Sequence, residues 1–194
     1  MLYRFIRQIF AWIFMTVYRW DVGGRENIPE QGPFILCANH ISWWDPPLVG
    51  ALTKHKVRFM AKEELFNIPV IGKILPLIHV FPVKRNSADR RAIKTALDTL
   101  KEGGNLGIFP EGTRSRTADL LPPQAGVGLI AVKSEAPVVP VAIIGPYVPF
   151  KPLKIRIGEP VRFPEYYGSK AKAGDLEDVA KQIMSEIARL RQSE

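Results

Sequence analysis

The residues best suited to chemistry are His40 and Asp45, five positions apart in the segment CANHISWWDPPL at 37–48. Five steps along a helix rotate by about 140°, and five along a strand reach opposite faces, so neither element brings these side chains together. They meet only if the chain turns between them. Two prolines follow Asp45, which favours such a turn with Asp45 as a helix N-cap. A histidine held by a carboxylate keeps its other ring nitrogen free as a general base.

Each of these residues also has a purely structural explanation, which the sequence leaves open. Asp45 alone would serve as a helix cap, and a single histidine is more often structural than catalytic. Asn39 suits the backbone of a turn. Trp43 and Trp44 fit either a core or a surface that contacts a membrane interface.

A second polar segment, FPEGTRS at 109–115, carries groups suited to an anionic ligand. Gly112 allows the backbone to approach a ligand closely. Arg114 presents a planar fork that matches phosphate oxygens. Thr113 adds a hydroxyl, and Glu111 adds an acceptor for a substrate hydroxyl or for Arg114. The alternative is a surface turn with a solvated arginine.

Two shorter segments add candidates without carrying an assignment alone. FPVKR at 81–85 ends an apolar run with Arg85, a second candidate phosphate ligand. The run VVPVAI at 138–143 contains Pro140, which fits an edge or bulged strand beside an acyl chain.

The elements that must position these residues follow from hydrophobic patterning. Short apolar runs between Gly, Pro and polar clusters predict strands at 33–38, 57–61, 78–83, 105–109, 138–144 and 153–157. Helical spacing predicts helices at 87–101, 126–135 and 176–191, with Ser87 and Asp175 as N-caps. The alternation predicts an α/β fold, a single-domain αβ sandwich with a mixed, mainly parallel sheet. Such folds place their reactive groups at strand ends.

The first twenty residues, MLYRFIRQIFAWIFMTVYRW, predict an aromatic helix with basic residues at both ends. Its longest uncharged run, at 8–18, is too short to cross a bilayer, which takes about 20 residues. We expect residues 1–20 to form an interfacial membrane-anchoring helix and 21–194 to form the main domain. Packing on the domain's own core is the alternative.

Composition narrows the functional classes. Of 194 residues, 46% are hydrophobic, and the only cysteine, Cys37, excludes an intramolecular disulfide framework. The formal net charge of +8 indicates an anionic partner: nucleic acid, an anionic membrane surface or a phosphorylated substrate. A basic nucleic-acid-binding domain would use Lys54, Lys56 and Arg58, but the sequence contains no recognised nucleic-acid motif. It also lacks a nucleophile elbow, a phosphate loop and a zinc helix.

Together, these segments resemble the glycerolipid acyltransferases, in particular the bacterial 1-acylglycerol-3-phosphate acyltransferases. NHISWWD at 39–45 matches the family's N-H-x-x-x-x-D block, and FPEGTRS at 109–115 matches its third block. The segments at 81–85 and 138–143 resemble the second and fourth blocks. The order and approximate spacing of the four blocks are kept.

The resemblance implies transfer of a fatty acyl group from acyl-CoA or acyl-ACP to the sn-2 hydroxyl of lysophosphatidic acid, giving phosphatidic acid. Glycerol-3-phosphate or another lysolipid is the alternative acceptor. No metal or bound cofactor is implied. The expected place is the cytoplasmic face of an anionic membrane, as a peripheral or monotopic protein. By analogy His40 is the base and Asp45 its orienter, and the glycerol-phosphate site comprises Arg85, Glu111, Gly112, Thr113 and Arg114.

Overall fold

The computed structural model describes residues 2–84, 89–117, 119–168 and 171–192. Its strands are β1 (Asp21–Gly23), β2 (Ile35–Ala38), β3 (Val57–Lys62), β4 (Val80–Val83), β5 (Asn105–Ile108), β6 (Val138–Ile144) and β7 (Lys154–Ile157). Its α-helices are α1 (Leu2–Thr16), α2 (Asp45–Ala51), α3 (Ile71–Leu77), α4 (Arg90–Lys101), α5 (Ala125–Ser134) and α6 (Ala173–Gln192).

The strands form one sheet in the order β1-β7-β6-β2-β5-β3-β4. All neighbours are parallel except β6 and β7, which are antiparallel. The predicted α/β fold with a mixed, mainly parallel sheet is therefore confirmed. Because β2 and β5 are adjacent and parallel, with Cys37 opposite Ile108, the segments that follow them leave the sheet at the same edge.

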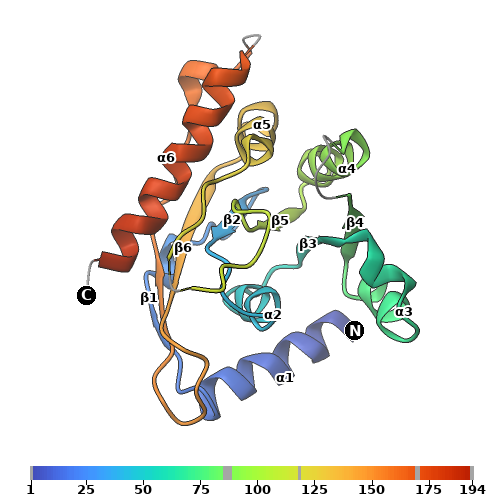
Figure 1. The fold of residues 1–194 in the computed structure, drawn as a ribbon, viewed down its shortest axis with the longest axis vertical. Coiled ribbons are helices and arrows are strands. Elements are labelled where there is room, and N and C mark those ends of the chain that lie inside the picture. The colour runs from blue at the N-terminus through green and yellow to red at the C-terminus, as the bar shows by residue number, and fades with distance from the viewer. Residues whose placement is uncertain (1, 85–88, 118, 169–170, 193–194) are drawn as a thin grey trace.

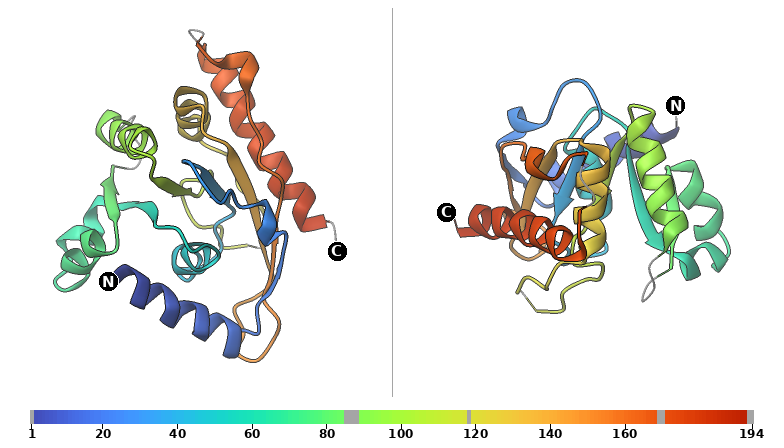
Figure 2. Two further views of the ribbon diagram at one scale, coloured as in Figure 1. Left: turned by 180° about the vertical axis from the view of Figure 1, so that it is seen from behind. Right: turned by 90° about the horizontal axis from the view of Figure 1, so that it is seen from above.

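Helices cover both faces of this sheet (Figure 1). Along β2, Ile35 and Cys37 belong to the core shared with α4, α5 and α6. Leu36 and Ala38 belong to the core shared with α1 and α2. Successive strand residues point to opposite faces, so a fully apolar strand such as β2 serves both cores. Seen from behind, the same three layers are visible (Figure 2).

The patterning missed two elements and misplaced the starts of two helices. β1 has only three residues, and α3 contains no buried residue, so neither carries a clear periodic signal. α4 begins at Arg90, and its N-cap is Asp89, whose carboxylate accepts the N–H groups of Arg91 and Ala92. The predicted cap, Ser87, lies outside the described residues. α6 begins at Ala173, so the predicted N-cap Asp175 lies inside its first turn and that prediction is wrong.

Pro140 does not lie on an edge strand, so that half of the prediction of an edge or bulged strand is wrong. β6 is an interior strand between β2 and β7. The proline is accommodated because β7 ends at Ile157, before it reaches the position opposite Pro140. No residue of β7 therefore requires the backbone N–H that proline lacks. Its carbonyl still accepts the N–H of Gly158 at 2.9 Å.

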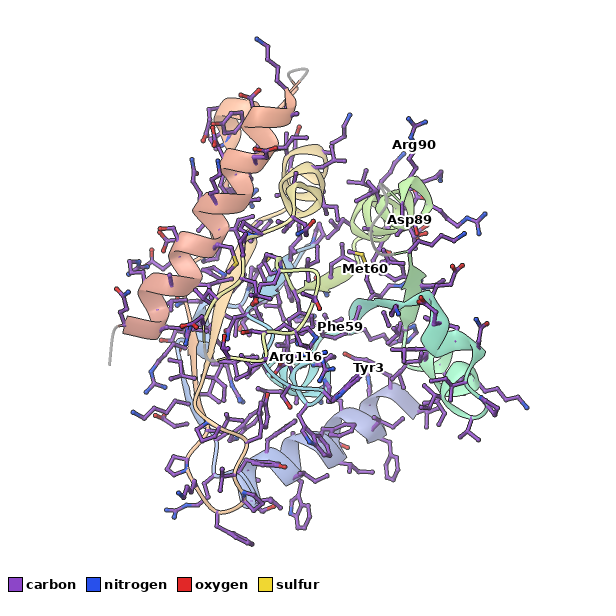
Figure 3. All side chains as sticks on the ribbon, in the orientation of Figure 1. Tyr3, Phe59, Met60, Asp89, Arg90 and Arg116 are labelled. Atoms are coloured by element: carbon purple, nitrogen blue, oxygen red, sulfur yellow. The ribbon has the colours of Figure 1, made fainter. Side chains whose placement is uncertain are left out.

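The N-terminal helix α1 is apolar on two faces. Its inner face packs on the core through the buried Phe14. The Tyr3 hydroxyl accepts the Val57 N–H at 2.9 Å, and Figure 3 shows Tyr3 directed from α1 into the molecule. Its outer face exposes large apolar side chains: Leu2, Phe5, Ile9, Trp12 and Met15. Core packing thus accounts for one face and leaves the outer face uncovered.

Candidate active site

His40 and Asp45 are in direct contact beyond the carboxyl end of β2. His40 Nδ1 lies 2.7 Å from Asp45 Oδ2. His40 comes two residues after β2, and Asp45 begins α2, so the chain turns between them as their spacing requires. Asp45 is fully buried, whereas His40 remains 9% exposed. The imidazole is therefore fixed by a buried carboxylate while its ring keeps limited access to solvent.

The Asp45 carboxylate also organises the turn that carries His40. Its Oδ2 accepts the N–H groups of Ile41 at 2.6 Å and Ser42 at 2.7 Å. The N-cap position of α2 is Trp44, and Asp45 is the first helical residue, so the N-cap interpretation of Asp45 is wrong. The carboxylate points back over the preceding turn and does not cap the helix that follows.

Tyr147 is a partner of this carboxylate that sequence reasoning missed. Its hydroxyl donates to Asp45 Oδ1 at 2.5 Å from 102 positions away in the chain. Burial, together with the charge of Asp45 and the hydrogen bond to it, raises the pKa of Tyr147, which keeps the hydroxyl protonated as a donor. No motif marks this residue, because only the connection between β6 and β7 brings it to the site.

Asn39 ties the end of β2 to β6. It is fully buried, its amide donates to the Ile143 carbonyl at 3.0 Å, and its side-chain oxygen accepts the Ile143 N–H at 2.7 Å. These two bonds replace ladder hydrogen bonds where the chain leaves the sheet. Asn39 therefore has the backbone role that the sequence left open, and it fixes the starting point of the His40 turn.

Glu111 holds the 109–115 segment against the His40 turn. One carboxylate oxygen accepts the His40 N–H at 2.8 Å and the other accepts the Leu121 N–H at 3.2 Å. The segment makes a further bond from the Ser115 N–H to the His40 carbonyl at 2.8 Å. Glu111 is 3% exposed, and its burial raises the pKa of the carboxyl, opposed by these backbone donors. Its contacts are with backbone and not with Arg114.

Two aromatic rings form a stack that supports one face of the His40 imidazole. The Phe109 ring stacks on His40 with centroids 4.1 Å apart and planes 21° apart. Phe59 stacks on Phe109 in turn, at 6.2 Å and 20°, and Figure 3 shows Phe59 near the middle of the molecule. Gly107 makes room for this arrangement, because a Cβ added there would meet the Phe59 ring at 2.0 Å.

The exposed part of the site contains the remaining anion-binding candidates. Gly112 adopts a φ of +68°, which favours glycine, and Thr113 beside it is exposed. The Arg114 guanidinium lies over the Trp43 ring, 3.9 Å from its centroid. Trp43 belongs to the turn between His40 and Asp45, so this contact brings Arg114 against that turn. Arg85 lies outside the described residues, so the structure does not place it relative to Arg114 and Trp43.

The profile of the Acyltransferase family matches residues 19–144, more than half of the chain. The chain belongs to the acyltransferase family. Over 86% of its length, this acyltransferase is 35% identical to the 1-acyl-sn-glycerol-3-phosphate acyltransferase of Bacillus subtilis, and it covers 86% of that protein. The resemblance inferred from the four blocks is confirmed.

A solved structure shares the whole fold of this acyltransferase. The crystal structure of the 1-acyl-sn-glycerophosphate (LPA) acyltransferase PlsC from Thermotoga maritima matches with a TM-score of 0.72 and 31% sequence identity. The match covers 100% of this chain and 79% of that one. A lyso-ornithine lipid O-acyltransferase of Pseudomonas aeruginosa is 36% identical over 59% of this chain and 44% of its own length. The family therefore includes enzymes named for different acceptors.

The alternative of a nucleic-acid-binding domain loses support at Arg58. Its guanidinium donates to the Thr99 hydroxyl at 3.1 Å and lies over the Phe81 ring, so it is turned toward α4 and β4.

Within the described residues, no group of three or more His, Cys, Asp or Glu is placed to hold a metal ion. In the same part of the chain, no helix combines the length and apolar character needed to span a bilayer.

Proposed function

We propose that this acyltransferase moves a fatty acyl group from an acyl thioester, acyl-CoA or acyl-ACP, to the sn-2 hydroxyl of lysophosphatidic acid, giving phosphatidic acid. The observation that carries the proposal is the buried contact of 2.7 Å between His40 and Asp45 inside the family's first block. The printed names of the Bacillus and Thermotoga relatives support this acceptor.

The reaction proceeds by direct transfer. Because Nδ1 of His40 faces Asp45, Nε2 is the nitrogen that takes the proton from the acceptor hydroxyl. That oxygen attacks the thioester carbonyl, and collapse of the tetrahedral intermediate breaks the C–S bond. The thiolate leaves and takes the proton back from the imidazolium. Asp45 stabilises that imidazolium while it exists, and no step is assigned to a metal or bound cofactor.

The 109–115 segment binds the phosphate of the acceptor in this proposal. Arg114 is the principal ligand, since a guanidinium pairs with phosphate oxygens in two parallel hydrogen bonds. Gly112 and the exposed Thr113 leave backbone and hydroxyl donors open to the ligand. Glu111 acts indirectly, by holding this segment to the His40 backbone. Arg85 is proposed as a further phosphate ligand from its place in the second block alone.

The enzyme works at the surface of an anionic membrane as a peripheral or monotopic protein. Support comes from the exposed apolar face of α1 and from the net charge of +8. The helix α3, which has no buried residue, exposes further apolar side chains: Ile71, Ile74 and Leu77. The cytoplasmic face is proposed because acyl thioesters are supplied there.

The acceptor headgroup separates the main proposal from its alternative. The Pseudomonas enzyme is named for a lyso-ornithine lipid acceptor, although it shares 36% identity over the matched region. A different lysolipid or glycerol-3-phosphate is therefore the competing acceptor. The presence of Arg114 over Trp43 favours a phosphorylated acceptor in this chain.

The decisive experiment is a mass-resolved acyl-transfer assay with several lysolipids and glycerol-3-phosphate, each offered with acyl-CoA and with acyl-ACP. We expect phosphatidic acid to form most rapidly from lysophosphatidic acid. His40→Ala should lower kcat by about 10²- to 10⁴-fold, which is the usual contribution of a general base, while the melting temperature stays close to that of the wild type. Unchanged turnover in His40→Ala would overturn the proposed mechanism.

Ser42→Ala is the control variant that tests for a covalent mechanism with a serine nucleophile. The Ser42 hydroxyl accepts the Trp44 N–H at 3.2 Å, so it has a structural role in the turn. We expect this variant to stay within a few-fold of wild-type activity, because direct transfer needs no nucleophilic side chain. Mass spectrometry of the quenched reaction should find no acylated protein.

A further inference from the structure

Tyr147 provides a hydrogen bond to the carboxylate of Asp45 from a position outside the four blocks. Three of the four donors on this carboxylate, namely the imidazole of His40 and two backbone N–H groups, converge on Oδ2. The other oxygen, Oδ1, accepts the Tyr147 hydroxyl at 2.5 Å. Asp45 is fully buried, so removal of that hydroxyl leaves a carboxylate oxygen without its protein donor.

Tyr147 is itself held by α1 and by the two residues that follow this helix. Its ring lies 5.6 Å from the Tyr18 ring and 6.5 Å from the Phe14 ring, centroid to centroid. The connection that carries it is fastened to the end of α1, because the Phe150 N–H donates to the Val17 carbonyl at 2.6 Å. Movement of the hydroxyl away from Asp45 would therefore disturb packing on α1.

We propose that Tyr147 is a positioning residue for acyl transfer: it fixes the Asp45 carboxylate, and through it the orientation of the His40 imidazole, from the end of α1. This inference rests on the proposed function. Carboxylate rotation about its Cβ–Cγ bond is limited from one side by the backbone donors of the turn and from the other by Tyr147. Both constraints keep Oδ2 on His40 Nδ1, which aims Nε2 at the acceptor hydroxyl.

The first test is Tyr147→Phe in the full-length protein, assayed with lysophosphatidic acid and acyl-CoA or acyl-ACP, whichever the wild type uses. We expect kcat to fall about tenfold, with both KM values within about twofold of wild type, because one charge-assisted hydrogen bond is lost and no substrate contact changes. Tyr18→Phe is the matched control, since it removes a hydroxyl from the same aromatic cluster but not from Asp45. We expect kcat of Tyr18→Phe to equal that of the wild type.

A double substitution separates positioning from general structural support. In the His40→Ala background the base is absent, so Tyr147→Phe should change the residual rate by less than about twofold. A purely structural role would instead lower the residual rate and the melting temperature together. If Tyr147→Phe is poorly folded, 3-fluorotyrosine at position 147 keeps the ring and the hydroxyl, adds one small fluorine atom, and makes the hydroxyl a stronger donor. A changed kcat at an unchanged melting temperature then supports the inference.

Wild-type kcat in both Tyr147→Phe and the fluorotyrosine protein would overturn the inference, and so would an equal loss of kcat in Tyr18→Phe. The proposed function fails in a distinguishable way. In that case the wild type transfers no acyl group, or His40→Ala is as active as the wild type, and the role of Tyr147 falls with it. Activity that depends on His40 but not on Tyr147 refutes the positioning role alone.

Discussion

At the residue scale, the candidate site consists of two buried carboxylates around the partly exposed imidazole of His40. Asp45 and Glu111 are almost wholly buried, and both carboxylates accept backbone N–H groups of the His40 turn. Arg114 lies outside this buried group, on the exposed Trp43 ring. The division suggests that the acids fix geometry and that the arginine meets the ligand.

Arg114→Ala should raise the KM for lysophosphatidic acid about tenfold and leave kcat nearly unchanged, because it removes binding shared by ground and transition states. Trp43→Ala should raise the same KM by a smaller factor, about two- to fivefold, since the guanidinium loses the ring that orients it. Steady-state kinetics at saturating donor measure both. If neither KM changes, the phosphate binds elsewhere.

Glu111 should leave a signature in the pH dependence of stability. Burial raises the pKa of its carboxyl above the ordinary value of 4.5, so the folded protein binds this proton more tightly than the unfolded chain does. The free energy of unfolding therefore falls as pH rises above 4.5 through the raised pKa. Denaturant titrations at several pH values should show a weaker fall in Glu111→Gln than in the wild type. Parallel curves would contradict this assignment.

At the element scale, parallel pairing of β2 and β5 creates the site. The two strands end together, so the His40 turn and the 109–115 segment emerge side by side. They are joined by two hydrogen bonds, from the Ser115 N–H to the His40 carbonyl and from the His40 N–H to the Glu111 carboxylate. Beneath them, β3 supplies Phe59, which packs flat only because β5 carries Gly107. The stack of rings thus links β3 and the end of β5 to the imidazole.

Gly107→Ala should destabilise the protein by about 1–3 kcal/mol and lower acyl transfer, because the new Cβ would displace Phe59 and the ring below His40. Thermal melting and the acyl-transfer assay measure the two effects. Gly174→Ala is the control, since a Cβ added there meets no atom within 4 Å. A fully active and stable Gly107→Ala protein would show that the ring stack is dispensable.

At the scale of the whole molecule, the exposed large apolar side chains are concentrated on particular elements. Within the described residues, the outer face of α1 and the segment around α3 account for most of the exposed large apolar side chains, and Phe150 is 72% exposed on the loop that contacts α1. The chain also carries a net charge of +8. Apolar faces combined with basic charge are typical of proteins that bind anionic bilayer surfaces.

Vesicle flotation should therefore show binding to vesicles rich in anionic phospholipid, with weaker binding to zwitterionic vesicles and at high salt. Phe5→Ser combined with Trp12→Ser should reduce binding strongly, since both side chains are more than 60% exposed on α1 and contribute no core packing. Ile71→Ser with Ile74→Ser tests α3 in the same assay. Equal binding of all variants would refute a membrane role for these faces.

The His40–Asp45 motif, the class of fold and its principal strands were available from the sequence, because each rests on local information. Strand propensity, helical periodicity and the NHISWWD and FPEGTRS segments are properties of short stretches. The need for a turn between His40 and Asp45 also followed from spacing alone. β1 and α3 escaped prediction because a three-residue strand and a helix without a buried face leave no such local pattern.

Tertiary structure alone decided the partners of the motif residues. Tyr147 reaches Asp45 across 102 positions, and Asn39 pairs with Ile143 across 104. Strand order also decided that Pro140 lies on an interior strand, where β7 ends before it would require the N–H that Pro140 lacks. These contacts depend on which strands become neighbours. The strand order is the one that buries both apolar faces of the sheet at once. That order depends on the whole chain and is not encoded in any short segment.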